Sequence, residues 1–108
     1  MKKVPIDFAW SSLPVPALFI NPEDVITEAN PAAEGFFNTS GKSLRGKSIW
    51  KQLVVGAPLE KSFARAKEFS TPLFVNDVEV SSFGTSQLQC NLTFAPVVQF
   101  PGHFIVLI

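Results

Sequence analysis

The sequence holds few of the residues that carry covalent or metal chemistry. It has one cysteine, Cys90, and one histidine, His103, among 108 residues. A single cysteine cannot form an internal disulfide, and a chain without disulfides is typical of the reducing cytoplasm, which is the expected location. One histidine without a cluster of cysteines or carboxylates around it does not make a metal site. Disulfide-stapled and metal-dependent proteins are therefore not expected.

The sequence also lacks an excess of positive or negative charge, and it has no long apolar run. Nine basic residues balance nine acidic ones, so the net charge is zero. Without a broad positive field, nucleic acid and anionic membranes are not expected as partners. No apolar run approaches the roughly 20 residues that span a bilayer, and no charged leader with a cleavable apolar stretch precedes Pro5.

What the sequence does have is apolar content for one core. Apolar residues make up 46% of the chain, which at this length predicts a single domain over residues 1–108. Residues 103–108, HFIVLI, read as a strand with no turn or polar tail after it. We therefore expect the domain to come from a longer protein.

The first third of the chain predicts a helix and then a hairpin. Pro5 and apolar residues at helical spacing predict a short lead-in helix ahead of two prolines. ALFIN (17–21) and VITEAN (25–30) predict two strands joined around Asn21 and Pro22. The apolar residues of the lead-in helix are Ile6, Trp10 and Leu13.

At Asn30 and Pro31 the sequence pattern changes from that of a strand to that of a helix. An asparagine side chain can accept from the free N–H groups at a helix start, and proline fits the first helical position because no donor is missed there. Glu34 adds negative charge at the positive end of the helix dipole. We therefore predict a helix with Asn30 as its cap, whose paired Phe36 and Phe37 can point inward.

The rest of the chain predicts short helices followed by strands. Residues 43–54 are expected to form short helical pieces, and 59–69 an amphipathic helix. After Pro72, apolar and polar residues alternate. This pattern predicts three antiparallel strands linked by turns at 83–86 and 99–103. The economical fold is α+β, with five antiparallel strands and helices across one face. The expected core face of the amphipathic helix is Leu59, Phe63, Ala66 and Phe69.

This order of elements, at this length, resembles PAS sensory domains. The resemblance covers nearly the whole chain and is sharpest in LPVPALFINPEDVITEANPAAEGFF (13–37) and SGKSLRGKSIWKQL (40–53). These stretches are similar to the amino-terminal PAS domain of NtrB-type nitrogen-regulation sensor histidine kinases. The resemblance implies the PAS strand order 2-1-5-4-3 and a regulatory role upstream of a dimeric kinase core.

The resemblance also implies partners and an enzymatic parent protein. NtrB-type kinases phosphorylate a response regulator, and assist its dephosphorylation, under the control of a PII-type protein. His103 stands in PGHFIV rather than in a phosphoacceptor context, and no ATP-binding glycine boxes occur. The domain itself is therefore expected to lack kinase activity.

No cofactor is expected. The reactive Asn-Cys-Arg-Phe motif of flavin-binding relatives is missing, and the helix at 59–69 has no histidine to ligate haem. Cys90 is interpreted as a small core residue and His103 as a surface or structural one. A small-molecule pocket between the long helix and the sheet stays open as an alternative, although its bulky candidates favour a filled core. Those candidates are Phe37, Ile49, Trp50, Phe63, Cys90, Leu92 and Phe94.

Two groups of charged residues could form a catalytic or docking site, but exposure to solvent is the simpler interpretation. The carboxylates Glu23, Asp24 and Glu28 are expected to be solvated on a hairpin turn and a wet strand face. No serine has a histidine and an acid at a recognisable spacing, so a small α+β enzyme lacks a credible catalytic set. A local basic bias could dock an acidic partner, but solvated helix faces are the expectation. It consists of Lys42, Arg45, Lys47 and Lys51.

Self-association has a clearer physical basis. HFIVLI is apolar on both strand faces, whereas a sheet covered by helices on one side should show polar residues on the other. The lead-in helix can cover part of the second face, and a second copy of the chain can complete the layer through a two-fold contact. The interface candidates are Ile6, Phe8, Trp10, Leu13, Ile105 and Leu107. The favoured function is thus a signalling and dimerisation module, with a ligand- or cofactor-binding PAS sensor as the alternative.

Overall fold

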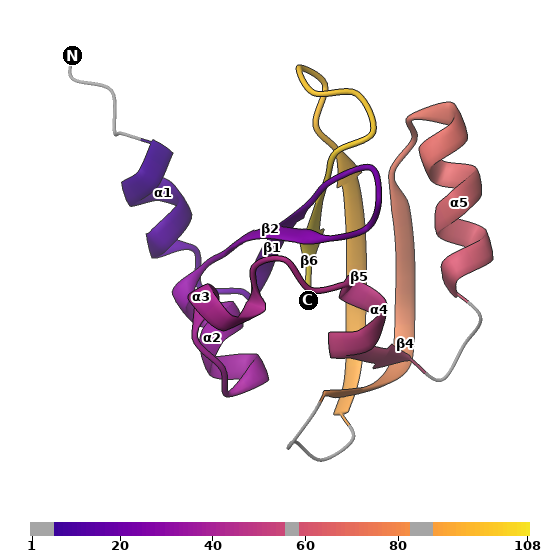
Figure 1. Ribbon diagram of the computed structural model, residues 1–108. Coiled ribbons are helices and arrows are strands. Elements are labelled where there is room, and N and C mark those ends of the chain that lie inside the picture. The colour runs from indigo at the N-terminus through magenta and orange to yellow at the C-terminus, as the bar shows by residue number, and fades with distance from the viewer. Residues whose placement is uncertain (1–5, 56–58, 83–87) are drawn as a thin grey trace.

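The computed structural model describes residues 6–55, 59–82 and 88–108, which form one antiparallel sheet with all helices but the first on one side (Figure 1). Within these residues the sheet has six strands in the order β2-β1-β6-β5-β4-β3. The antiparallel PAS-type sheet predicted from the sequence is confirmed. The strands are β1 (Ala17–Ile20), β2 (Ile26–Ala29), β3 (Leu53–Val55), β4 (Leu73–Ser82), β5 (Leu88–Pro96) and β6 (Phe104–Leu107).

The expected count of five strands is wrong by one, because β3 was assigned to helical pieces. The stretch Ile49–Gln52 makes only one helical turn, and the next three residues pair antiparallel with β4, Val54 lying opposite Ser81. Two of these three residues are valines, whose branched side chains favour strands. Leaving β3 out, the strand order is the one that the PAS resemblance implied.

The helices fall between β2 and β4, apart from the first one. Figure 1 shows α5 alongside β4 and places α2 and α3 near β1 and β2, while α4 contacts β3. Among the described residues, none of these helices has the length and hydropathy to cross a membrane. The helices are α1 (Ile6–Ser12), α2 (Pro31–Phe37), α3 (Gly41–Leu44), α4 (Ile49–Gln52) and α5 (Leu59–Phe69).

The amphipathic helix α5 has the predicted bounds, but one of its predicted core residues is wrong. Leu59, Phe63 and Ala66 are buried, as expected from their spacing. Phe69 is 66% exposed, because it is the last helical residue and the next one, Ser70, turns the chain with a φ of 50°. The inward face of α5 therefore ends at Ala66.

Asn30 connects the start of α2 to the sheet. Its side chain is fully buried, and Oδ1 accepts from Ala33 N–H at 2.9 Å and from Ala17 N–H at 3.0 Å. Its Nδ2 donates to the Val15 carbonyl at 2.9 Å. Pro31 takes the first helical position, where a missing donor costs nothing. The residue that caps α2 thus also fixes where β1 begins.

The core lies between the helices and the inner face of the sheet. Phe63 of α5 sits at its centre, with ring centroids 4.8 Å from Phe94 and 4.9 Å from Phe104. Trp50 approaches the same cluster, 5.9 Å from Phe63. Phe37 is buried, and Phe36 packs against the core from a half-buried position. Large aromatic side chains from α2, α4, α5 and two strands therefore fill the interior.

The two edges of the sheet differ in how far other segments cover them. At the β2 edge, Ile26 donates to the Lys47 carbonyl and accepts from Gly46 N–H, both at 2.8 Å, and Val25 bridges to Ser48. At the other edge, β3 pairs with only residues 80–82 of β4, and no described strand pairs with residues 73–79 on that side. Segment 46–48 thus covers one edge, and the first part of β4 forms the other together with β3.

Of the two turns expected in the second half of the chain, the structure describes one. At 99–103 the chain does turn, and His103 N–H donates to the Phe100 carbonyl at 3.0 Å. Gly102 has a φ of 81°, and a Cβ there would lie 2.9 Å from Cγ of Pro22. The turn expected at 83–86 lies outside the described residues.

Candidate functional site

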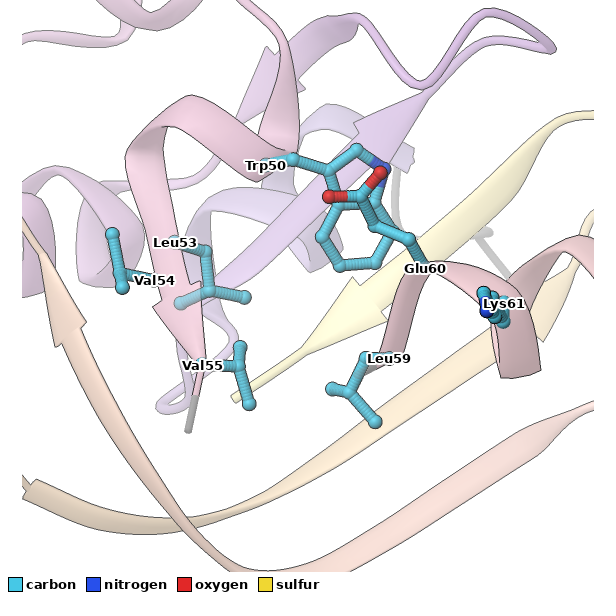
Figure 2. A pocket seen from close by; sticks show the side chains of 7 residues that line it. All are labelled: Trp50, Leu53, Val54, Val55, Leu59, Glu60 and Lys61. Carbon is cyan, nitrogen blue, oxygen red and sulfur yellow. The ribbon is translucent and has the colours of Figure 1, made fainter. Parts of the chain in front are cut away.

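A pocket opens between β3 and the first turn of α5 (Figure 2). Its volume of about 440 Å³ lies within the range of about 300 to 1,000 Å³ that is usual for small-molecule sites. The walls are mainly apolar, with one acidic and one basic side chain from α5. The lining residues are Trp50, Leu53, Val54, Val55, Leu59, Glu60 and Lys61.

The pocket does not lie where the sequence candidates would place one. Of the seven, Trp50 is the one that lines it. Cys90 is half-buried and packs against the core. The remaining candidates are buried and pack into one another, so side chains fill that space; they are Phe37, Ile49, Phe63, Leu92 and Phe94.

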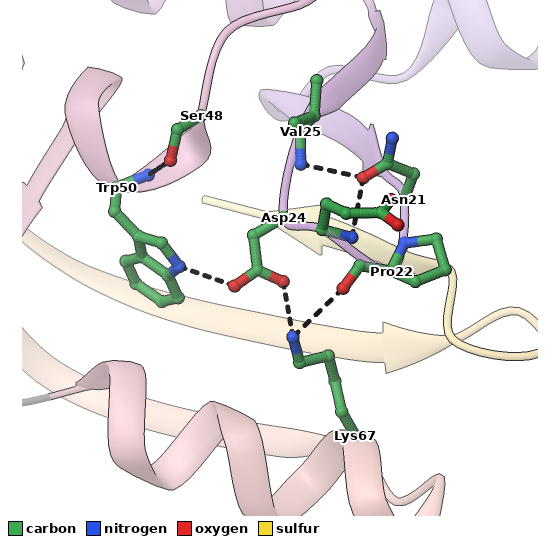
Figure 3. A network of polar contacts seen from close by, with 8 residues as sticks. Asn21, Pro22, Asp24, Val25, Ser48, Trp50 and Lys67 are labelled. Atoms are coloured by element: carbon green, nitrogen blue, oxygen red, sulfur yellow. Dashed lines mark hydrogen bonds and ion pairs between the residues drawn. The ribbon is translucent and has the colours of Figure 1, made fainter.

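Asp24 is the centre of a polar network near this pocket (Figure 3). Its Oδ2 accepts from Trp50 Nε1 at 2.8 Å, and its Oδ1 forms an ion pair with Lys67 Nζ at 2.9 Å. The Asp24 and Lys67 side chains are only 18% and 25% exposed. Lys67 also donates to the Pro22 carbonyl at 3.3 Å and lies 5.3 Å from the Phe63 ring centroid. One carboxylate thus joins the β1–β2 turn to α4 and α5.

The expectation that three carboxylates are simply solvated is therefore wrong for Asp24. Glu23 is exposed, as expected. Glu28 is half exposed and pairs with Arg45 at 3.3 Å, a surface contact of small energetic weight. Asp24 differs because its turn lies beside α4 and α5, where an indole N–H and an ammonium group meet its two oxygens.

The remaining candidates are unremarkable in the structure. The basic residues Lys42, Arg45, Lys47 and Lys51 are all exposed. His103 is half-buried, with Nδ1 lying 3.3 Å from the Pro101 carbonyl oxygen. In the described part of the chain, no three histidine, cysteine or acidic side chains are gathered as metal ligands would be.

The outer face of the sheet carries an apolar patch. Strand pairing puts Phe19, Ile105 and Ala95 in one row, and Leu107, Thr93 and Phe74 in the next. Ile105 and Leu107 alternate with the fully buried Val106 and face away from the core. Most of these side chains are half-buried, and Phe74 is 66% exposed. We name Phe19, Phe74, Ala95, Ile105 and Leu107 the outer patch.

The N-terminal helix contacts this patch through Trp10. The Trp10 ring stacks on Phe19 with centroids 4.6 Å apart, while Figure 1 shows most of α1 standing away from the sheet. Leu13 is half-buried just after the helix. The side chains of Ile6 and Phe8 lie outside the described residues. The structure therefore gathers Trp10 and Ile105 on one side of the sheet, with Leu107 in the neighbouring row.

Comparison with known proteins identifies this arrangement. NtrB of Rhodobacter capsulatus, a sensory histidine kinase/phosphatase, is 41% identical over all 108 residues, and the chain spans 30% of its length. The crystal structure of the PAS domain of nitrogen regulation protein NR(II) from Vibrio parahaemolyticus superposes with a TM-score of 0.82 at 19% identity, covering 97% of this chain and 96% of that one.

A further relative in fold comes from another class of protein. The PAS domain of a LuxR-family transcriptional regulator from Burkholderia thailandensis, solved in complex with ethanol, has a TM-score of 0.67 at 15% identity, over 97% of this chain and 96% of that one. The family model described as the PAS fold matches residues 10–105. The chain therefore belongs to the PAS family.

Proposed function

We propose that the chain is the cytoplasmic regulatory PAS module of an NtrB-type nitrogen-regulation histidine kinase. The observation that carries the proposal is 41% identity to NtrB along the whole chain. Because the chain spans 30% of that relative, phosphoryl transfer would belong to other parts of the parent protein. His103, the one histidine of the sequence, precedes a central strand instead of standing on a helix. The response regulator and the PII-type protein would then be partners of the parent protein.

Removing the module from its parent protein tests this division of labour. We expect a parent lacking residues 1–108 to keep autophosphorylation with ATP, because the module supplies no reacting group. Its balance between kinase and response-regulator phosphatase activities should change. Radiolabelled phosphate transfer, measured for the parent, the truncated parent and the isolated module, checks both points. Phosphate incorporation into the isolated module, or an unchanged activity balance after truncation, would refute the proposal.

We further propose that the module pairs with a second copy of itself through the outer patch. The patch is apolar, and the covered face of the sheet is on the opposite side. Trp10 covers Phe19, but Phe74 lies 66% exposed at the far side of the patch. Burial of apolar area that water still reaches favours association. A two-fold contact between like surfaces is the commonest way to cover such a patch.

Ile105→Lys is expected to weaken self-association by at least about tenfold in Kd, because a charge would be buried at the centre of the contact. Sedimentation equilibrium of the chain over a range of concentrations measures the change. Gln89→Lys is the control: it adds the same charge on the same face, opposite Glu79 and away from the patch. Equal Kd values for both variants, or a monomeric wild type at high concentration, would contradict the interface.

A second candidate function is small-molecule sensing, which the pocket of about 440 Å³ favours. The LuxR-family PAS domain with this fold was solved with bound ethanol, and this chain would use its own pocket between β3 and α5. A ligand would place its apolar part against Trp50, Leu53 and Leu59 and a polar group near Glu60 or Lys61. Added mass in native mass spectrometry, or visible absorbance of the purified domain, distinguishes this function from a module that acts by packing alone.

A further inference from the structure

Asp24, Trp50 and Lys67 form what we name the Asp24 latch. The three residues come from the β1–β2 turn, α4 and α5, and they are separated by 26 and 43 positions in the sequence. The two distances, 2.8 Å to Trp50 Nε1 and 2.9 Å to Lys67 Nζ, are those of charge-assisted hydrogen bonds. The site is largely shielded from water, so these bonds are screened less than surface pairs.

The backbone at Asp24 supports a role beyond an ordinary turn. Its φ of 63° lies in the left-handed region, which aspartate enters more readily than most residues but where glycine is the least strained. The backbone is nevertheless fully engaged: Asp24 N–H donates to the Asn21 carbonyl, and the Asp24 carbonyl accepts from Ile49 N–H, both at 2.9 Å. Glycine would satisfy the same turn with less strain. The side chain at this position therefore contributes through its contacts with Trp50 and Lys67.

Trp50 belongs to three environments at once. Its indole N–H is bound by Asp24, its ring packs 5.9 Å from Phe63 and 6.2 Å from Phe94, and it lines the pocket. Lys67 stands on α5, and the first turn of that helix supplies Leu59 to the opposite wall of the pocket. The Asp24 carboxylate thus binds one residue from α4 and one from α5, the two helices that line the pocket.

We propose that the Asp24 latch sets the spacing between α4 and α5 and thereby the shape of the pocket. With the latch closed, Trp50 stays against the aromatic core and α5 stays against the sheet. With the latch released, Trp50 gains contact with water and α5 separates locally, while the sheet remains folded. The proposal concerns the conformation of the chain itself, so it stands whether or not the parent protein is a nitrogen-regulation kinase.

The test uses Trp50 as its own reporter. The sequence has two tryptophans, so Trp10→Phe leaves Trp50 as the single emitter and retains an aromatic ring on Phe19. In this background, Asp24→Gly removes the carboxylate and relieves the left-handed backbone. We expect a red shift of Trp50 emission and an increase of about tenfold in the amide exchange rates of α5, which is the loss of one charged hydrogen bond. Amide exchange of the sheet strands should stay near the reference value.

Two further variants complete the experiment. Glu23→Gln removes the charge of the neighbouring exposed carboxylate, and both signals should stay unchanged. Lys67→Met keeps the aliphatic stem, removes the ammonium group, and should speed exchange in α5; it carries the test if Asp24→Gly does not fold. Unchanged α5 exchange and Trp50 emission would overturn the proposal. So would an equal acceleration of exchange in α5 and the strands, since that means loss of global stability only.

Discussion

Replacing Asn30 with alanine is expected to lower the free energy of unfolding by about 3 to 4 kcal/mol. The substitution removes the α2 cap and both bonds between this side chain and the start of β1. The cost is larger than for an exposed helix cap, because Ala17 is fully buried and water cannot replace the partner of its N–H. Urea unfolding followed by circular dichroism measures the change.

Two matched variants separate the cap from the connection to the sheet. Ser40→Ala removes the α3 cap, whose Oγ accepts from Ser43 N–H at 3.2 Å in an exposed position, and should cost about 1 kcal/mol or less. Asn30→Asp keeps the accepting oxygen and loses the donor to Val15, so it should also destabilise. If Asn30→Ala cost no more than Ser40→Ala, the buried connection between α2 and β1 would contribute nothing to stability.

Phe63→Ala is expected to cost about 3 to 5 kcal/mol, the range for truncating a buried aromatic residue. Phe63 is fully buried, and its ring is the one that touches Trp50, Phe94 and Phe104 together. Removing it leaves a cavity whose walls belong to α4 and two strands, so no single element can move in to close it. Urea denaturation measures the loss of unfolding free energy, provided that the variant and the wild type have the same m-value.

The control for this prediction lies on the same helix. Phe69→Ala deletes the same ring from the last residue of α5, where 66% of the residue is exposed, and should change stability by no more than about 0.5 kcal/mol. Helix propensity favours alanine in both variants, so the difference between them isolates the core packing. Similar losses for both would mean that the aromatic cluster does not dominate the core.

Elements with strong local signals were predictable from the sequence. The pair Asn30-Pro31 marks the start of α2, because cap and first-position preferences act within a few residues. The apolar period of α5 was equally clear over eleven residues. β3 escaped prediction because three residues cannot show a period, and its partner strand lies more than twenty positions further along the chain.

The candidate site was less predictable, for a related reason. Asp24 stands in a polar turn between two strands, where solvated carboxylates are the rule. Only the folded chain brings the Trp50 indole and the Lys67 ammonium to it, and neither separation matches a helical or strand spacing. Most of the residues that line the pocket were not foreseen, because its walls include β3, the strand that the sequence did not reveal.

The edges of the sheet limit how copies of this domain can assemble. Segment 46–48 occupies the hydrogen-bonding groups of Ile26, whereas at the other edge β3 pairs with only residues 80–82 of β4. Open-ended stacking of sheets edge to edge needs two free edges, so the cover over the β2 edge disfavours it. Flat contact between outer surfaces, by contrast, closes on itself after two copies. The covered β2 edge, which resists such polymerisation, would leave face-to-face pairing as the permitted geometry.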